Sequence, residues 1–363
     1  MTGLFCSSAF SSAGSGYLYI KKMKLFIIYT ARIGHLAMNT ELFLRRVSAG
    51  MLNGALVRLV DHESGQFVAN RQLYEMIKRT HPVFEMPTAT FLQLIESGHE
   101  NAGILFSGTN EFLEFNTISP QLSFLPEEHV AGRKLLEKLG IYDRPYVCMH
   151  NRTSAYLKEV LKPYSFQHHD YRDCSIENYM MAAEWLTTQG IYVIRMGQIA
   201  SDPMMTDNPM IIDYTNDRRT DFGDIYLPAH CKFFLGNTAG IWLVATIFGR
   251  NNATANNVPF DMTPLLRGDL FIYKNIDIPF YQQLDLDIHK FEGNDIPVIQ
   301  NSPEQILYLA IEMLYRLDNV YDEKPHVAAL RSKFRSLWMP KMRCFGTVAD
   351  IGDQFIVEKQ LML

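Results

Sequence analysis

Residues 217–249 read DRRTDFGDIYLPAHCKFFLGNTAGIWLVATIFG. The apolar pattern predicts a helix over 225–230, a short strand over 232–235 and a second helix over 241–248. The strand and the second helix are joined by the small residues 236–240, GNTAG. This order of strand, small-residue turn and helix is typical of α/β proteins in which a ligand approaches the backbone closely. The first N–H groups of such a helix have no partner within it and favour an anion, typically phosphate.

The GNTAG turn also has a plainer interpretation, in which it is only a tight connection between a strand and a helix. The turn alone does not separate the two interpretations. If it binds phosphate, we expect the Thr238 hydroxyl and the Ala239 and Gly240 amides to hold the anion, with Asn237 beside them.

Length and composition favour a two-domain globular protein. The chain has 363 residues, more than one ordinary core accommodates, and its apolar and charged fractions of 47% and 20% are those of a soluble globular protein. A formal net charge of −5 gives no reason to expect nucleic acid as a partner. Any phosphate binding must therefore come from local basic residues and helix ends.

Cysteine usage and hydropathy favour a cytoplasmic protein. The five cysteines are scattered and contain no C-x-x-C pair, which argues against a disulfide framework or a structural zinc site. No apolar run has the length of a membrane helix, so no transmembrane segment is expected, while peripheral membrane association stays open. Residues 1–22 are rich in Ser and Gly and have no charge before Lys21, which is typical of a flexible N-terminal extension. A weak organellar or secretory signal is the alternative.

Strands alternate with helices along the rest of the chain, beginning with the apolar run MKLFIIYT at 23–30. This alternation predicts an α/β fold with two facing Rossmann-like domains. We place the first domain at 23–140, the second at 141–320, and a C-terminal helix and tail at 321–363.

The segment after Gly249 is harder to interpret. Residues 251–260, NNATANNVPF, form a polar cluster that predicts a turn, and residues 270–273 suit an edge strand. A helix capped by Ser302 is expected to end at Leu317, and a further helix at 326–337.

Four loops follow predicted strands, and ligands of such folds lie at the carboxyl ends of the strands. These loops are Arg32–His35, His150–Thr153, Arg195–Gln198 and Gly236–Gly240. Two facing domains would create a cleft lined by all four.

Basic residues in these loops are candidates for a diphosphate site. Arg152 and Arg195 belong to the same domain as GNTAG, and arginine binds phosphate with two parallel hydrogen bonds. The alternative for each arginine is a structural ion pair. His35 follows Gly34 in a strand-end turn, where it could act as a general base or contact a substrate, or could simply begin a helix.

Two acidic clusters invite a metal-site interpretation. In His168–Asp173, HHDYRD, the ligand types are adjacent rather than at helix or turn spacing, so we favour a polar loop in which Asp170 or Arg172 touches a ligand. Asp285 and Asp287 match a D-x-D pair, but no strand context supports them and we reject a metal role. The sequence also contains no G-x-S-x-G, P-loop, G-x-G-x-x-G or H-E-x-x-H motif.

Several of these motifs resemble those of known glycosyltransferases. FLGNTAG resembles the segment of heptosyltransferase-like enzymes that holds the diphosphate of the sugar donor, and RIGHLA resembles their first-strand loop. CMHNRTSAYL is similar to the H-x-R segment of fucosyltransferase-type enzymes, whose Arg contacts the donor phosphate. Together with residues 171–197, the chain resembles a bacterial family of glycosyltransferases usually associated with surface carbohydrate or secondary-metabolite gene sets.

The resemblance implies a metal-independent glycosyltransferase of the GT-B architecture with no cofactor and a nucleotide-diphospho sugar as co-substrate. The donor would bind through Arg152, Arg195 and Asn237–Gly240, and a saccharide or other hydroxyl acceptor would bind near Arg32 and Gly34. The catalytic base would be His35 or Asp170, and His35 stands where the family has an acid. That departure leaves two alternatives open: a non-catalytic nucleotide-sugar or glycan-binding subunit, and a sugar-nucleotide epimerase on the same fold.

Overall fold

The computed structural model describes residues 23–104, 111–154, 167–198, 203–215, 218–284, 286 and 298–363. The N-terminal extension and the D-x-D acids Asp285 and Asp287 therefore lie outside the described residues. The chain divides into two compact units. Unit 1 comprises residues 1–107 and 117–125, and unit 2 comprises residues 108–116 and 126–363.

Unit 1 is built on a parallel sheet with the strand order β3-β2-β1-β4. Its elements are β1 (Lys24–Ile27), α2 (Ile33–Ser48), β2 (Ala55–Leu59), α3 (Arg71–Thr80), β3 (Val83–Met86), α4 (Thr88–Glu96) and β4 (Glu100–Ile104). The order 3-2-1-4 is that of one doubly wound Rossmann-like unit. The strand predicted at 103–106 corresponds to β4, which begins earlier, at Glu100. Residues 105 and 106 of that prediction lie outside the described residues.

Alternating side chains on β1 anchor helices to both faces of the sheet of unit 1. Leu25 packs in one apolar cluster with Phe91 of α4. The next residue, Phe26, instead meets Phe43 of α2 edge to face, with ring centroids 5.1 Å apart. Because both faces are covered, β1 is apolar after its exposed first residue, Lys24.

Unit 2 contains a seven-stranded parallel sheet with the order β11-β10-β9-β8-β5-β6-β7. Its elements are α5 (Phe112–Thr117, which ends in unit 1), α6 (Pro126–Lys138), β5 (Tyr146–His150), η1 (Gln167–Arg172), α8 (Glu177–Thr188), β6 (Tyr192–Arg195), β7 (Ile211–Asp213), α9 (Asp221–His230), β8 (Phe234–Gly236), α10 (Trp242–Ile247), β9 (Asn252–Asn257), β10 (Leu270–Tyr273), α11 (Phe280–Gln283), α12 (Pro303–Leu317), α13 (Pro325–Arg335), β11 (Asp350–Ile351), α14 (Asp353–Glu358) and η4 (Gln360–Met362). If β5 is counted as strand 1 of this sheet, the order read from β7 to β11 is 3-2-1-4-5-6-7. This is again the doubly wound order, so the predicted α/β class with Rossmann-like units is confirmed.

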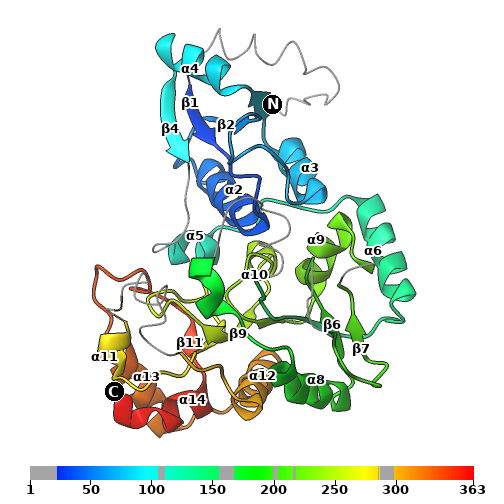
Figure 1. Cartoon of the computed structure of the whole chain (residues 1–363), viewed down its shortest axis with the longest axis vertical. Coiled ribbons are helices and arrows are strands. Elements are labelled where there is room, and N and C mark those ends of the chain that lie inside the picture. Colours follow the sequence, from blue (N-terminus) through cyan, green and yellow to red (C-terminus); the bar gives the residue numbers. More distant parts are fainter. Residues whose placement is uncertain are drawn as a thin grey trace. The chain divides into compact units, whose positions relative to one another are not determined.

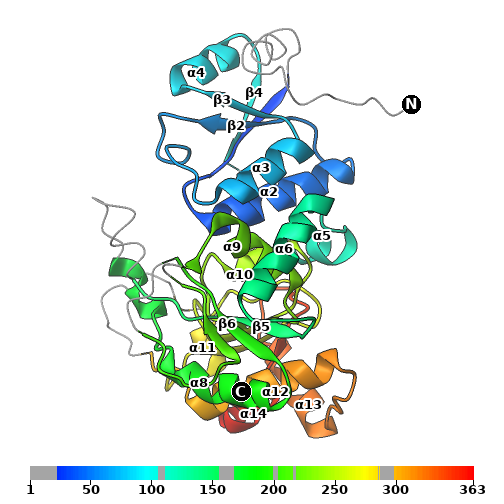
Figure 2. The same cartoon turned by 90° about the vertical axis from the view of Figure 1, so that its right-hand side faces the viewer.

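Helices cover both faces of the sheet of unit 2. The pair α8 and α12 lies side by side on one face, and α6, α9 and α10 lie on the other (Figure 1). The turned view shows the same layers (Figure 2). On β5, Val147 and Met149 join the cluster on the α8 and α12 face, while the hydroxyl of Tyr146 donates to the carbonyl of Leu227 in α9 at 3.0 Å.

The helix α6 belongs to unit 2, although the predicted first domain extended to residue 140. Close packing holds it there. A Cβ on Gly132 of α6 would lie 1.9 Å from the ring of Tyr226 in α9, so only glycine allows this approach.

The prediction of a turn cluster at 251–260 is wrong, because Asn252–Asn257 form β9, an inner strand. Ala253 and Ala255 fill the space beneath α12. The strand contains a bulge, because Phe271 pairs with Thr254 whereas Tyr273 pairs with Asn257. The predicted edge strand, β10, is also an inner strand, because it pairs with β9 on one side and with β11 on the other.

Asparagine amides pair β9 with a segment far along the chain. Asn256 has φ of 51°, and its side-chain oxygen accepts the N–H of Asn301 at 2.7 Å. The oxygen of Asn301 in turn accepts the N–H of Asn256. Such tertiary pairing outweighs the turn preference of asparagine.

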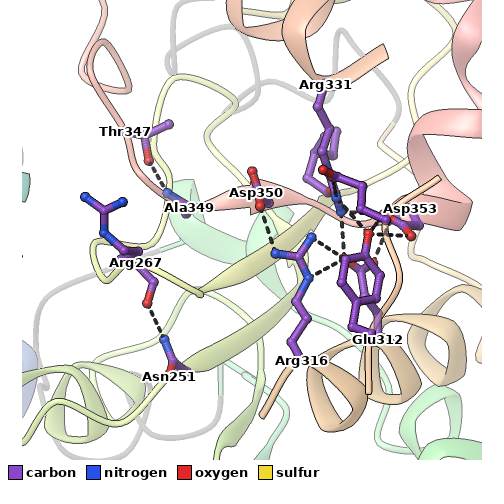
Figure 3. A network of polar contacts seen from close by, with 12 residues as sticks. Asn251, Arg267, Glu312, Arg316, Arg331, Thr347, Ala349, Asp350 and Asp353 are labelled. Carbon is purple, nitrogen blue, oxygen red and sulfur yellow. Dashed lines mark hydrogen bonds and ion pairs between the residues drawn. The ribbon is translucent and has the colours of Figure 1, made fainter. Parts of the chain in front are cut away.

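The predicted C-terminal tail supplies the edge strand β11 of the sheet. A network of ion pairs holds it: Arg316 contacts Asp350 at 2.8 Å, and Arg331 donates to Glu312 at 2.6 Å (Figure 3). Arg331 also donates to the carbonyl of Ile351 at 2.9 Å. The charges are mostly buried, and each has a partner of opposite sign.

Candidate functional site

The topological switch point of unit 2 lies between β5 and β8, where the strand order reverses. His150 of β5 is in register with Gly236 of β8, so the loops that follow these strands are neighbours. A Cβ on Gly236 would lie 2.9 Å from the carbonyl oxygen of His150. The first glycine of GNTAG therefore permits the close approach of the two strand ends.

One hydrogen bond joins the two loops directly. The N–H of Arg152 donates to the side-chain oxygen of Asn237 at 2.9 Å. The amide nitrogen of Asn237 donates to the carbonyl of Arg172 in η1, also at 2.9 Å. The fully buried Asn237 thus positions the Arg152 backbone and η1 at once.

The rest of the GNTAG turn is also closely packed. The hydroxyl of Thr238 donates to the carbonyl of Val258 at 2.9 Å, and the carbonyl of Thr238 accepts from the guanidinium of Arg172. Ala239 is 9% exposed and Gly240 is half-buried. The helix that follows, α10, has only six residues, Trp242–Ile247, so its dipole is small. An anion at this turn would therefore depend on the backbone N–H groups of the turn and not on the dipole of α10.

Arg152 is a nearly buried guanidinium held by a carboxylate. It is 8% exposed and forms an ion pair with Asp173, whose second oxygen accepts the N–H of Ser154 at 2.8 Å. Burial raises the pKa of Asp173, and the neighbouring Arg152 opposes this shift. Asp173 is the orienting group that the sequence analysis did not identify.

Asp170 lies in η1, half-buried, one turn before Asp173. The N–H of Asp173 donates to the carbonyl of Asp170 at 2.9 Å, and the negative charge of Asp170 helps raise the pKa of Asp173. The predicted polar loop is thus a short 3-10 helix packed on the GNTAG turn through Arg172.

Arg195 ends β6 and is 1% exposed. It pairs with Asp213 at 3.2 Å and donates to the side-chain oxygen of Asn151 at 3.3 Å. Asn151 donates to the carbonyl of Cys174 at 3.0 Å. Arg195 therefore has the partners of a structural ion pair. Through Asn151 it also supports the loop that carries Arg152.

His150 was not among the predicted site residues, although it precedes Asn151 at the same strand end. Its Nδ1 contacts the carbonyl of Met196 at 2.7 Å, and since a carbonyl only accepts, Nδ1 carries the proton. Burial, assisted by the positive charges of Arg195 and Arg152, lowers the pKa of His150 to about 4. The ring is consequently neutral at pH 7.

The predicted acceptor-side residues belong to unit 1, at the carboxyl end of β1. Arg32 is the N-cap residue of α2, and Gly34 and His35 lie in the first turn of that helix. The ring of His35 packs beside that of Tyr29, with centroids 5.0 Å apart. The structure therefore groups Arg32, Gly34 and His35 together, and groups Arg152, Asp170 and Asn237–Gly240 in unit 2.

Two further interactions brace the site of unit 2 and were not expected from the sequence. Lys274, directly after β10, donates to the carbonyls of Tyr171 and Asp173, both at 2.7 Å. Asp261 pairs with Arg343 through two hydrogen bonds of 2.6 and 2.7 Å. A charged residue at a strand end is a signal for Lys274, but the prediction of β10 as an edge strand places Lys274 away from the site.

Across the described residues, no group of three or more His, Cys, Asp or Glu side chains has the geometry of a metal site. Within the same part of the chain, no helix combines the length and the apolarity needed to cross a bilayer.

No family model matches the chain, and neither does any curated protein. Among solved structures, a family 9 glycosyl transferase from Veillonella parvula is similar, with 10% identity over 81% of this chain and 97% of that chain and a TM-score of 0.45. The ADP-heptose heptosyltransferase II of E. coli is similar with 12% identity over 82% and 100% and a TM-score of 0.46. An iron-containing dodecameric heptosyltransferase in complex with ADP-D-beta-D-heptose, from E. coli, has 12% identity over 82% and 77% and a TM-score of 0.40. At this level of similarity none of them assigns an activity to this chain.

Proposed function

We propose that the protein is a metal-independent glycosyltransferase that binds a nucleotide-diphospho sugar in unit 2. One observation carries the proposal: Arg152 and the GNTAG turn are hydrogen-bonded neighbours at the switch point of a doubly wound sheet. Ligands of such sheets bind at that point, and an arginine beside backbone N–H groups suits a diphosphate. The diphosphate contacts would be Arg152 and the N–H groups of residues 238–240.

The remaining predicted donor residues have supporting roles in this proposal. Asn237 places Arg152, and Arg195 fixes the same loop through Asn151. The chemistry would join an acceptor hydroxyl oxygen to the anomeric carbon of the sugar. The bond from that carbon to the diphosphate breaks, and the cationic groups of unit 2 stabilise the leaving diphosphate.

The acceptor is proposed to bind at Arg32 and Gly34 in unit 1. A base must take the proton of the acceptor hydroxyl, and His35 and Asp170 are the two candidates. If His35 is the base, its imidazole must be free to accept that proton. Replacing His35 by Gln should then abolish transfer and leave donor affinity unchanged.

A non-catalytic nucleotide-sugar-binding protein is the second candidate, because His35 stands where the resembled family has an acid. Product analysis after incubation with each nucleotide sugar, with and without a panel of hydroxyl acceptors, separates the candidates. A transferase releases nucleoside diphosphate faster when its acceptor is present. Tight binding without turnover over the panel identifies the binder, and an altered sugar on an intact nucleotide, formed without acceptor, identifies an epimerase.

A thermal-shift screen of nucleoside diphosphates in the presence of EDTA should precede this experiment. Only a ligand of the native state raises the melting temperature, so the best nucleotide names the donor class. No shift with any nucleoside diphosphate or its sugars would contradict the proposed function.

A further inference from the structure

The ring of His150 is held in a fixed orientation at the switch point of unit 2. His150 ends β5, two residues before Arg152, and is in register with Gly236 of the GNTAG turn. Its Nδ1 donates to the carbonyl of Met196 at 2.7 Å. A Cβ on Gly197 would lie 3.5 Å from Nδ1, so the loop after β6 packs against this side of the ring.

The other ring nitrogen, Nε2, is accessible from solvent. Among the described residues no group forms a hydrogen bond with Nε2, and Nε2 is also not one of the polar side-chain atoms that are buried without a partner. The residue as a whole is only half-buried. Nε2 therefore lies within reach of a ligand, at the end of the sheet where ligands of doubly wound folds bind.

The charge state of the ring decides what Nε2 can bind. Burial, together with the positive charges of Arg195 and Arg152, lowers the pKa of His150 to about 4, so the ring carries a single proton at neutral pH. Because that proton is on Nδ1, Nε2 can only accept a hydrogen bond. A fully ionised phosphate also only accepts, so Nε2 does not suit the diphosphate. The matching group on a sugar is a hydroxyl, which can donate.

We propose that His150 is a specificity-determining residue of the nucleotide-sugar site, whose Nε2 accepts a hydrogen bond from a sugar hydroxyl of the bound ligand. This inference rests on the proposed function. Arg152 and the backbone N–H groups of the turn donate to the diphosphate, whereas His150 accepts from a hydroxyl. The ribose and the transferred sugar both carry hydroxyls, and both offer Nε2 the same chemistry.

The test compares the full-length wild type with His150→Asn and His81→Gln. An asparagine at this position can place its amide N–H near the site of Nδ1, so it can keep the bond to the carbonyl of Met196 while it lacks Nε2. The control, His81→Gln, alters a histidine of unit 1 whose Nε2 contacts the carbonyl of Gly54 at 3.0 Å. The control should bind every ligand as the wild type does.

Calorimetric titrations in EDTA at pH 8, where the phosphates are ionised, use ADP, GDP, UDP and CDP, their glucose and mannose conjugates, and their 2′,3′-dideoxy forms. His150→Asn should weaken binding of the best conjugate about threefold to tenfold, the scale of a neutral hydrogen bond. If the parent nucleoside diphosphate loses the same factor and its dideoxy form binds both proteins equally, the ribose supplies the hydroxyl. If the nucleoside diphosphate binds both proteins equally, the transferred sugar supplies it.

A measurement on the wild type alone covers the case in which His150→Asn misfolds. In protein with 15N-labelled histidine, NMR should show His150 as the neutral tautomer protonated at Nδ1, and the ligand should shift the resonance of Nε2. A protonated ring, or an Nε2 resonance that the bound ligand leaves unchanged, would contradict the inference.

The outcomes distinguish this inference from the proposed function. Equal affinity of the wild type and His150→Asn for every ligand that carries hydroxyls would overturn the inference and leave the proposed function intact. A loss of affinity that persists with the dideoxy nucleoside diphosphates would also overturn it, because these ligands have no hydroxyl to donate. If the wild type binds none of the nucleotides, the proposed function fails, and the inference fails with it.

Discussion

The hydroxyl of Thr238 has one hydrogen to donate, and it donates that hydrogen to the buried carbonyl of Val258. A phosphate oxygen needs a donor, so this hydroxyl could reach phosphate only by releasing Val258. The hydrogen bond to Val258 is donated by the Thr238 hydroxyl and not by the backbone N–H groups of Ala239 and Gly240. These two N–H groups could therefore bind a phosphate oxygen without releasing Val258. At the scale of the residue, if the turn binds an anion as proposed, its main chain supplies the donors.

Thr238→Val tests this division of roles. Loss of the hydrogen bond to Val258 should lower the free energy of unfolding by about 1 kcal/mol, while pyrophosphate affinity stays within about twofold. Urea denaturation and calorimetry measure the two quantities. A tenfold loss of affinity at unchanged stability would show that the hydroxyl itself binds the anion.

Some site residues could be predicted from the sequence and others could not. The position of Arg152 at the carboxyl end of β5 was predictable, because it follows an apolar strand. Asp173 and Lys274 were not, because their roles depend on contacts between segments far apart in sequence. The periodicity of apolar residues assigns residues to helices and strands, but it does not show which side chains contact one another.

At the scale of the element, β9 is a strand whose residues favour turns. Its buried asparagines depend on partners far along the chain: Asn301 and Tyr179 bind Asn256, and Asp269 accepts the N–H of Asn252. Asn256 in particular combines a positive φ with two hydrogen bonds to Asn301. Its backbone N–H donates one of them, and its side-chain oxygen accepts the other. This dependence on tertiary partners explains why a local interpretation of 251–260 fails.

We expect Asn256→Ala to lower the free energy of unfolding by roughly 3 kcal/mol, from unsatisfied backbone groups and from the positive φ. Asn319→Ala is the control, because Asn319 has φ of 58° on the exposed surface after α12. It should lose only about 1 kcal/mol. Equal losses in urea denaturation would mean that the hydrogen bonds of Asn256 contribute nothing.

In unit 1, α2 holds the returning segment 117–125 through a buried ion pair. Glu41 accepts from Arg45 at 2.9 Å and from the N–H of Gln121 at 2.8 Å, and Arg45 donates to the carbonyl of Ile118. Burial raises the pKa of Glu41 to about 7 and lowers that of Arg45. For both groups, burial therefore changes the pKa more than the attraction between the two charges does.

This shift predicts how the stability of unit 1 depends on pH. Between the ordinary value of 4.5 and about 7, the native state binds a proton at Glu41 that the unfolded state has released. Stability should therefore fall as pH rises through this window, by at most roughly 3 kcal/mol. Glu41→Gln should remove the dependence, as measured by hydrogen exchange of α2, and an unaltered pH dependence in that variant would contradict the assignment.

At the scale of the whole molecule, the strand order of each unit follows from simple rules. Alternating strands and helices with right-handed connections predict doubly wound sheets, and both units have them. The seventh strand was not predictable, because it consists of two residues near the C-terminus, held beside β10 by contacts with distant segments such as the ion-pair network around Arg331 (Figure 3). The same segment braces the site of unit 2 through the pairing of Arg343 with Asp261.

The central claim is that Arg152 at the switch point of unit 2 binds the diphosphate of a nucleotide sugar. Calorimetric titration of the wild type, Arg152→Ala and Arg250→Ala with the best nucleoside diphosphate, in EDTA, tests it most directly. Arg250 is an exposed arginine just before β9, at the other end of the sheet, and its loss should leave affinity unchanged. The account predicts that Arg152→Ala weakens binding by about 1.5–3 kcal/mol, and an affinity equal to that of the wild type would contradict it.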